Sequence, residues 1–184
     1  MIARLLVVLV VFVMLAAPSV AAPPPEPHDY RLDDYNAPTP LTVAGRAAIG
    51  TAEARRLWEA HAAIFIDVIA APRRPASLPV GSLWLPTPHR DIPGSLWLPD
   101  SGRGALSPES AAWFRASLAR ITASRPDAPL VFYCRTDCWL SWNATKRAIE
   151  WGYSAAGWYR DGADGWRAAS LPLAEAQPPE DAPR

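Results

Sequence analysis

The chain has 184 residues, with 18 basic and 18 acidic side chains, so its formal net charge is zero. This length is enough for one domain with its own core, and the even charge balance, without a basic block, gives no electrostatic support for binding nucleic acid. Only two cysteines are present, which excludes a small domain held by a framework of disulfides, so the core must rest on ordinary hydrophobic packing.

The first 21 residues have the pattern of a secretory signal peptide. Arg4 supplies one positive charge, and residues 5–17 form an unbroken apolar run of 13 residues. As a helix this run would span only about 20 Å, short of the roughly 30 Å hydrocarbon core of a bilayer. Pro18 ends the run, and the small residues that follow suit a signal peptidase. We therefore expect cleavage after Ala21 or Ala22 and export to the periplasm; an uncleaved membrane anchor is the alternative.

The rest of the chain divides into three parts. Residues 22–41 and residues 174–184 are rich in proline and poor in core-forming side chains, so we predict a flexible leader and a disordered tail. Residues 42–173 remain as one folded domain.

Helical and strand patterns alternate within this domain. In chain order, the expected elements are a helix over residues 52–61 capped by Thr51, a strand over 63–69, an irregular proline-rich stretch over 73–93, a short strand over 95–98, a helix over 108–121 capped by Ser107, a strand over 130–133, a helix over 140–151 ended by Gly152, and a strand over 156–159. This order predicts an α/β domain with a mainly parallel central sheet flanked by helices.

One hexapeptide, GSLWLP, occurs twice, at residues 81–86 and 94–99. The spacing is too short for a stacking repeat, so we interpret it as a duplicated loop and strand segment.

Both cysteines follow the strand expected at residues 130–133. Cys134 ends that strand, and Cys138 comes four residues later, before the next helix. Open parallel sheets bind ligands at the carboxyl ends of their strands, and the N–H groups and dipole of a helix N-terminus stabilise negative charge. A thiolate or persulfide is such a charge, so we expect Cys134 to have a lowered pKa and to act as a nucleophile, with Arg135 as a positive neighbour. The alternative is that Cys134 is a small buried hydrophobic residue.

The spacing of the two cysteines brings their Cα atoms within reach of the roughly 4.4–6.8 Å that a disulfide requires. We interpret Cys134 as the nucleophile and Cys138 as the resolving thiol of thiol–disulfide or sulfur-relay chemistry. An inert disulfide and two free thiols are the alternatives. A purely structural staple is disfavoured because the stabilisation from a disulfide grows with the length of the loop that it closes.

Five segments resemble the motifs of a rhodanese domain. They are IFIDVI (64–69), DIPGS (91–95), LVFYCR (130–135), AIEWGY (148–153) and WYRDGADGW (158–166). Their order and spacing agree with the family over about residues 42–166. The resemblance implies a single rhodanese-like domain with Cys134 as the catalytic cysteine, and it implies that Asp67 orients the loop backbone.

A closer resemblance exists within that superfamily. The segments YRLDDYNAPTP (30–40), IPGSLWLPD (92–100), CWLSWNATKRA (138–148) and WYRDGADGW are similar to exported proteins that are named for a Cys-Cys-Trp (CXXCW) motif and accompany PQQ-dependent alcohol catabolism. That motif has two residues between the cysteines, whereas three stand here. The resemblance implies a periplasmic protein that works alongside a PQQ-dependent dehydrogenase or a c-type cytochrome and is not embedded in the membrane once processed.

The loop after Cys134 departs from that of ordinary sulfurtransferases, which carries glycine and serine around the persulfide. Asp137 lies in the middle of this loop, and its carboxylate would repel a persulfide unless it points outward or caps the helix. This disfavours ordinary thiosulfate sulfurtransferase activity. We assign to the loop and its support the following residues: Arg135, Thr136, Asp137 and Trp139 around the sulfur, with Asp67 and Asn143 as supporting residues.

Other cysteine sites are disfavoured. A rhodanese-related phosphatase would need Arg six positions after Cys134, where Leu140 stands, and a thioredoxin would have two residues between its cysteines. Zinc needs ligands beyond two thiols, and His28, His61 and His89 show no ligand spacing. We expect neither a metal nor a cofactor.

A function of a different class is also open. Nine tryptophans are many for this length, and exposed tryptophan favours interfaces, although most tryptophans lie in cores. A non-catalytic binding or assembly module for the dehydrogenase or its cytochrome is therefore the alternative to a reactive cysteine pair.

Overall fold

The computed structural model describes residues 22–183, and the predicted signal peptide at residues 1–21 lies outside them. Within the described part, no helix has both the length and the apolar character needed to cross a bilayer.

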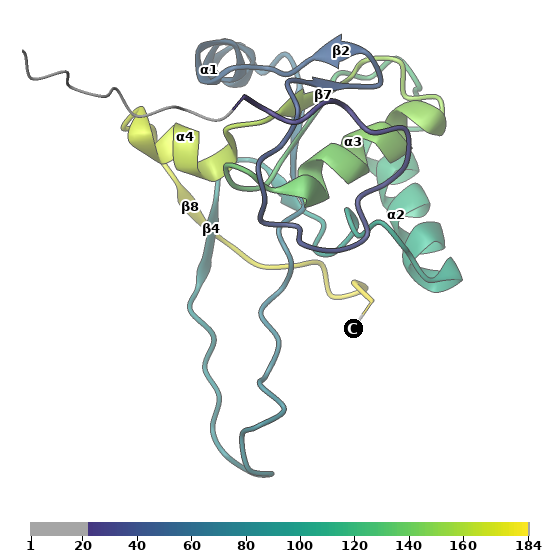
Figure 1. Cartoon of the computed structure of the whole chain (residues 1–184). Helices are drawn as coiled ribbons and strands as arrows, with labels where there is room; N and C mark the ends of the chain where they lie inside the picture. Colours follow the sequence, from purple (N-terminus) through teal and green to yellow (C-terminus); the bar gives the residue numbers. More distant parts are fainter. Residues whose placement is uncertain (1–21, 184) are drawn as a thin grey trace, which may run out of the picture.

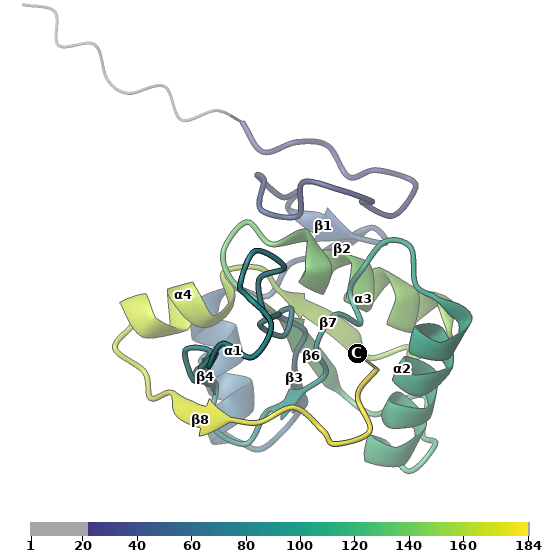
Figure 2. The same ribbon diagram turned by 90° about the horizontal axis from the view of Figure 1, so that it is seen from below.

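A parallel sheet of four strands, in the order β5-β3-β6-β7, forms the centre of the molecule. Strand β7 is labelled in Figure 1, and β3, β6 and β7 are seen next to one another in Figure 2. The strands are β3 (Ile64–Asp67), β5 (Leu96–Trp97), β6 (Leu130–Tyr133) and β7 (Ala156–Tyr159), and all three pairings are parallel. Strands β3 and β6 are almost wholly buried, as their uninterrupted apolar sequences predict for strands covered on both faces. The expected α/β class with a mainly parallel sheet is confirmed.

Two helices pack on each face of the sheet (Figure 2). Side chains of α2 (Pro108–Ile121) and α3 (Trp139–Glu150) share a core cluster with Ile66 and Phe132, while side chains of α1 (Thr51–Glu59) and α4 (Gly162–Ala168) share another with Phe65 and Val131. Because successive strand residues point to opposite faces, the alternation within β3 and β6 creates these two cores.

Capping residues near the helix ends explain where α2 begins and α3 ends. Ser107 caps α2 by accepting a hydrogen bond from the Ser110 N–H, with Pro108 at the first helical position, as predicted. Gly152 follows α3 with a φ of 95°, which suits glycine at a helix end. The predicted cap of α1 was wrong: Gly50 is the N-cap, because the hydroxyl of Thr51 bonds instead to Asp161 and Tyr159.

The segments on either side of the predicted domain are more structured than expected. In place of a disordered tail from residue 174, β8 (Ala174–Ala176) pairs antiparallel with β4 (His89–Asp91), which itself lies in the stretch expected to be irregular. In place of a free leader, residues 30–39 lie against α3 and the loop before it, ahead of a short hairpin of β1 (Thr42–Val43) and β2 (Arg46–Ala47). We call residues 30–39 the N-terminal strap.

Candidate functional site

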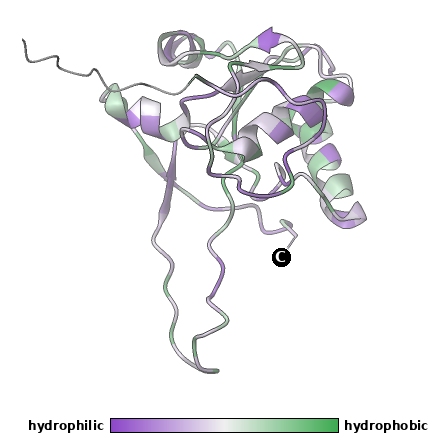
Figure 3. Cartoon of the chain, in the orientation of Figure 1, coloured by the Kyte–Doolittle hydropathy of each residue, from purple (hydrophilic) through white to green (hydrophobic). Residues whose placement is uncertain are grey.

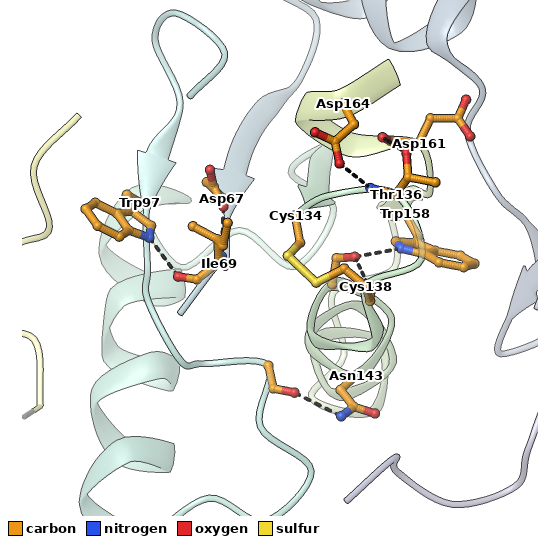
Figure 4. The surroundings of a disulfide bond; sticks show 12 residues. Asp67, Ile69, Trp97, Cys134, Thr136, Cys138, Asn143, Trp158, Asp161 and Asp164 are labelled. Atoms are coloured by element: carbon orange, nitrogen blue, oxygen red, sulfur yellow. Dashed lines mark hydrogen bonds between the residues drawn. A yellow bond between two sulfur atoms is a disulfide. The ribbon is translucent and has the colours of Figure 1, made fainter. Parts of the chain in front are cut away.

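Cys134 and Cys138 form a disulfide at the carboxyl edge of the sheet (Figure 4). Their Cα atoms are 6.1 Å apart, and the residues are only 1% and 2% exposed. Both nevertheless border a cavity of about 230 Å³, together with Tyr35 and Asn36 of the N-terminal strap. The structure therefore joins the two cysteines as a pair, at the edge where the sequence placed them.

The two sulfurs have different surroundings. Cys134 directly follows β6 and lies on the face that carries Phe132 and α3, whereas Cys138 is the N-cap residue of α3, with φ −116° and ψ 108°. The dipole of α3 thus acts most directly on Cys138, although the Cys138 side chain accepts no hydrogen bond from the helix N–H groups. The sequence predicted the stabilised thiolate at Cys134. In the structure, the helix dipole favours a thiolate at Cys138 instead.

The main-chain N–H groups that the sequence predicted to stabilise a charge on Cys134 are partly occupied by acceptors of the protein. The Thr136 N–H donates to the Asp164 carboxylate at 3.3 Å, and the Trp139 N–H donates to the Tyr35 carbonyl at 2.9 Å. The N–H groups of Thr136 in the loop and of Trp139 at the start of α3 are thus bound to acceptors of the protein itself. This reduces the capacity of the loop to hold a persulfide.

The Asp137 carboxylate does not face the disulfide. It accepts a hydrogen bond from the Thr39 N–H at 3.4 Å and lies 3.4 Å from the Arg160 guanidinium. The residue has a φ of 51°, a left-handed conformation that aspartate tolerates better than most side chains. Asp137 therefore ties the loop to the N-terminal strap. Arg135 remains exposed at the border of the cavity.

Asn143 supports the N-terminal strap instead of the sulfur. Its buried amide accepts from the Arg31 N–H at 3.0 Å and donates to the carbonyls of Arg31 at 2.8 Å and Gly102 at 2.9 Å. A buried amide with three partners is a strong local constraint. Asn143 thus holds the strap in place over the loop.

Trp139 is a core residue beneath the strap and does not present an anion-binding group to the cavity. It is buried, and its ring centroid lies 5.3 Å from that of Trp142. The Arg31 guanidinium lies 5.5 Å from the Trp139 ring centroid, within the range of a cation–π contact.

A polar cluster of Asp67, His89 and Asp91 lies on the opposite face of the sheet; the sequence pointed to Asp67 but not to its contact with His89. The buried carboxylate of Asp67 is 2.8 Å from His89 Nε2 and also accepts from the Ile69 N–H at 2.8 Å. Burial raises the pKa of Asp67, while His89 and Arg135 oppose that rise. Asp67 is aligned with Tyr133, one residue before Cys134, so strand alternation directs it away from the disulfide. His89 lies here because it belongs to β4, which falls in the stretch predicted to be irregular.

Asp91, in the same cluster, is expected to destabilise the fold at neutral pH. Burial and the nearby charge of Asp67 raise the pKa of Asp91 to about 6, above the usual value near 4. A pKa that is higher in the folded state contributes stability that is complete below pH ~4 and is lost as the pH rises through about 6. Asp91→Asn should therefore raise the free energy of unfolding by about 1–3 kcal/mol at pH 7 and change it little at pH 4.

Urea denaturation at the two pH values checks this prediction. The exposed Asp29, changed to Asn, is the matched control and should alter stability at neither pH. An Asp91→Asn protein that is less stable than the wild type at pH 7 would contradict the prediction.

No family model matches the sequence, and no curated protein matches it. Solved structures do match. A full-length protein from Lactobacillus plantarum has 18% identity and a TM-score of 0.45, covering 70% of this chain and 88% of the other. A human single-domain sulfurtransferase, TSTD1, has 21% identity and a TM-score of 0.39, covering 66% and 95%. An EanB variant in complex with hercynine has 18% identity and a TM-score of 0.48, covering 71% of this chain and 32% of the other. These values assign neither a family nor a reaction to the chain.

Proposed function

We propose that this protein carries out thiol–disulfide exchange at Cys134 and Cys138 on a rhodanese-like domain. One observation carries the proposal: the disulfide borders a cavity of about 230 Å³ at the carboxyl edge of a parallel sheet, where such sheets bind their ligands. A disulfide that closes so short a loop would stabilise the fold less, by constraining the unfolded chain, than one that closes a long loop.

The exchange proceeds in two displacements. A substrate thiolate attacks Cys134 Sγ, so that a bond forms between the substrate and Cys134, the bond to Cys138 breaks, and Cys138 leaves as a thiolate at the α3 N-terminus. A second substrate thiolate then attacks the substrate sulfur of the mixed disulfide and releases Cys134. The substrate loses two electrons and two protons to become a disulfide, and the protein gains them as a dithiol.

Hydrogen bonds that occupy the N–H groups of the loop favour exchange over sulfur relay. A persulfide at Cys134 would need several free N–H donors, yet those of Thr136 and Trp139 are bound to Asp164 and Tyr35. Exchange makes no such demand, because the charge that develops in the first displacement lies on Cys138.

The experiment that tests the function counts thiols. The purified protein should take up no alkylating reagent as isolated. After incubation with a dithiol peptide under native conditions it should take up two, with one peptide oxidised for each protein. A protein with Cys134→Ser and Cys138→Ser is the control and should leave the peptide reduced. A disulfide that persists in the folded wild type under excess dithiol would overturn the proposal.

We further propose that the protein is exported to the periplasm and works alongside a PQQ-dependent dehydrogenase or its c-type cytochrome. This rests on the signal-peptide pattern of residues 1–21 and on the resemblance carried by segments such as residues 138–148. The periplasm is oxidising, which suits a cysteine pair that acts as a disulfide. In a deletion strain, the dehydrogenase should contain more free thiol than in the parent; an unchanged thiol content rejects this partner. If loss of the whole protein abolishes alcohol growth while Cys134→Ser supports it as well as the wild type does, the non-catalytic assembly module is correct instead.

A further inference from the structure

The disulfide has little open space around it. Cys134 and Cys138 are 1% and 2% exposed, and the cavity that they border has a volume of about 230 Å³. Pockets that hold drug-sized ligands usually measure about 300–1,000 Å³. In the first displacement the substrate sulfur must contact Cys134 Sγ, so the group that carries this sulfur must enter the cavity. A single side chain is small enough to do so, whereas the surface of a folded protein is too broad.

Tyr35 of the N-terminal strap forms one wall of this cavity. Its ring packs against the core cluster that contains both cysteines, and Asn36 borders the cavity beside it. The strap crosses α3 (Figure 1), where the buried amide of Asn143 bonds to the main chain of Arg31. The strap is thus an addition to the sheet and its helices that narrows the approach to the two sulfurs.

Hydrogen bonds fix this wall in position. The Tyr35 carbonyl accepts from the Trp139 N–H at 2.9 Å. The Tyr35 hydroxyl accepts from the Gly104 N–H at 3.1 Å and donates to the Leu32 carbonyl at 2.7 Å, and the Arg103 guanidinium lies 5.5 Å from the ring centroid. Most of the strap is hydrophilic (Figure 3), and the Leu32 side chain is 65% exposed. Tyr35 is therefore held by polar contacts as a fixed wall and does not act as a mobile lid.

Two polar side chains at the cavity suit a main chain that is not folded. The guanidinium of Arg135 and the amide of Asn36 both border the cavity, and both residues are exposed. Each of these groups donates hydrogen bonds. An extended peptide presents carbonyls without partners, whereas a folded protein has paired most of its own.

We propose that Tyr35 restricts the exchange reaction to cysteines in extended, unfolded polypeptide segments and excludes cysteines on folded surfaces. This inference rests on the proposed function, because it concerns the thiol that attacks Cys134. An extended segment places its cysteine side chain in the cavity and its carbonyls beside Arg135 and Asn36. A cysteine on a folded surface brings its neighbours with it, and these overlap with Tyr35.

Reaction with two matched thiols tests the restriction. One is a folded protein with a single reduced surface cysteine, and the other is a peptide with the same cysteine and its flanking residues. The rate constant for loss of the Cys134–Cys138 disulfide is divided by that of the same thiol with oxidised glutathione, which removes differences in intrinsic thiol reactivity. The wild type should favour the peptide by about 10–100-fold, as a steric clash in a pocket does.

The two ways in which this experiment can fail are distinct. Equal normalised rate constants for peptide and folded protein would overturn the restriction and leave the exchange reaction in place. A peptide that leaves the disulfide intact would overturn the exchange reaction and the restriction with it.

Variants of the strap identify the wall. Tyr35→Ala should lower the preference for the peptide to within about threefold, while Tyr35→Phe, which keeps the ring, should retain it. A folded Tyr35→Ala protein with the full preference would overturn the role of Tyr35.

Asn36→Trp tests the same wall without altering the packing of Tyr35, because Asn36 is exposed. It should narrow the cavity and slow the reaction with the peptide by about tenfold. Leu32→Trp is the matched control, since Leu32 lies on the same strap but does not border the cavity, and it should leave this rate unchanged. Equal rates in the two tryptophan variants would contradict the proposal.

Discussion

Cys138→Ser should trap the protein in a mixed disulfide through Cys134, whereas Cys134→Ser should accumulate far less of one. In the first variant the substrate is bonded to a sulfur that ends a strand, and the thiol that would resolve the bond is missing. In the second, the substrate is bonded to Cys138, whose thiolate is stabilised by the N-terminus of α3 and is therefore the better leaving group. Added glutathione should release the second adduct quickly and the first slowly.

Mass spectrometry after mixing each variant with a peptide disulfide and then with glutathione measures this difference. Both variants lack the Cys134–Cys138 bond, so any effect of its loss on the fold cancels in the comparison. The protein with both serines should form no adduct. Equal persistence of the two adducts, or a longer-lived adduct at Cys138, would contradict the roles assigned to the two sulfurs.

Gly162→Ala should be strongly destabilising, because this glycine packs directly against the main chain of Cys134. Gly162 has a φ of 55°, and a Cβ atom placed on it would lie 2.5 Å from the Cys134 carbonyl oxygen, which accepts a hydrogen bond from the Ala163 N–H at 2.9 Å. Left-handed strain and crowding against the main chain together should lower the free energy of unfolding by about 2–5 kcal/mol.

Gly152→Ala is the matched control for this variant. Gly152 also has a positive φ, 95°, but no atom lies within 4 Å of the place of its Cβ, so it should show only the backbone strain of about 1–2 kcal/mol. Chemical denaturation of the two variants measures the difference. If Gly162→Ala proves as mild as Gly152→Ala, the close approach to Cys134 does not constrain the loop.

The central fold follows from the sequence because its signals are local. The apolar runs of β3 and β6, the Ser107-Pro108 start of α2 and Gly152 after α3 each act on neighbouring residues. The pairing of β4 with β8 does not follow, since both strands are three residues long, contain polar residues and come from distant parts of the chain. Pairing of that kind is set by tertiary context.

In the candidate site, too, the local features could be predicted from the sequence and the long-range contacts could not. The placement of Cys134 and Cys138 between a buried strand and a helix could be predicted, because it depends on a single stretch of sequence. The acceptors that bind the loop amides, Tyr35 and Asp164, come from segments far from it. The burial of Asn143 under the N-terminal strap and the contact of Asp67 with His89 likewise depend on long-range packing. Sequence thus located the cysteine pair but not the groups that surround it.

The central claim is that the disulfide between Cys134 and Cys138 is reactive in the folded protein, and its reduction potential tests this most directly. Equilibration of the purified protein with glutathione or dithiothreitol buffers, followed by alkylation, gives the value. Because α3 stabilises the Cys138 thiolate and so the reduced state, we predict a potential above about −270 mV, in the range of exchange catalysts. A potential below about −300 mV, as structural disulfides of secreted proteins have, would contradict the account.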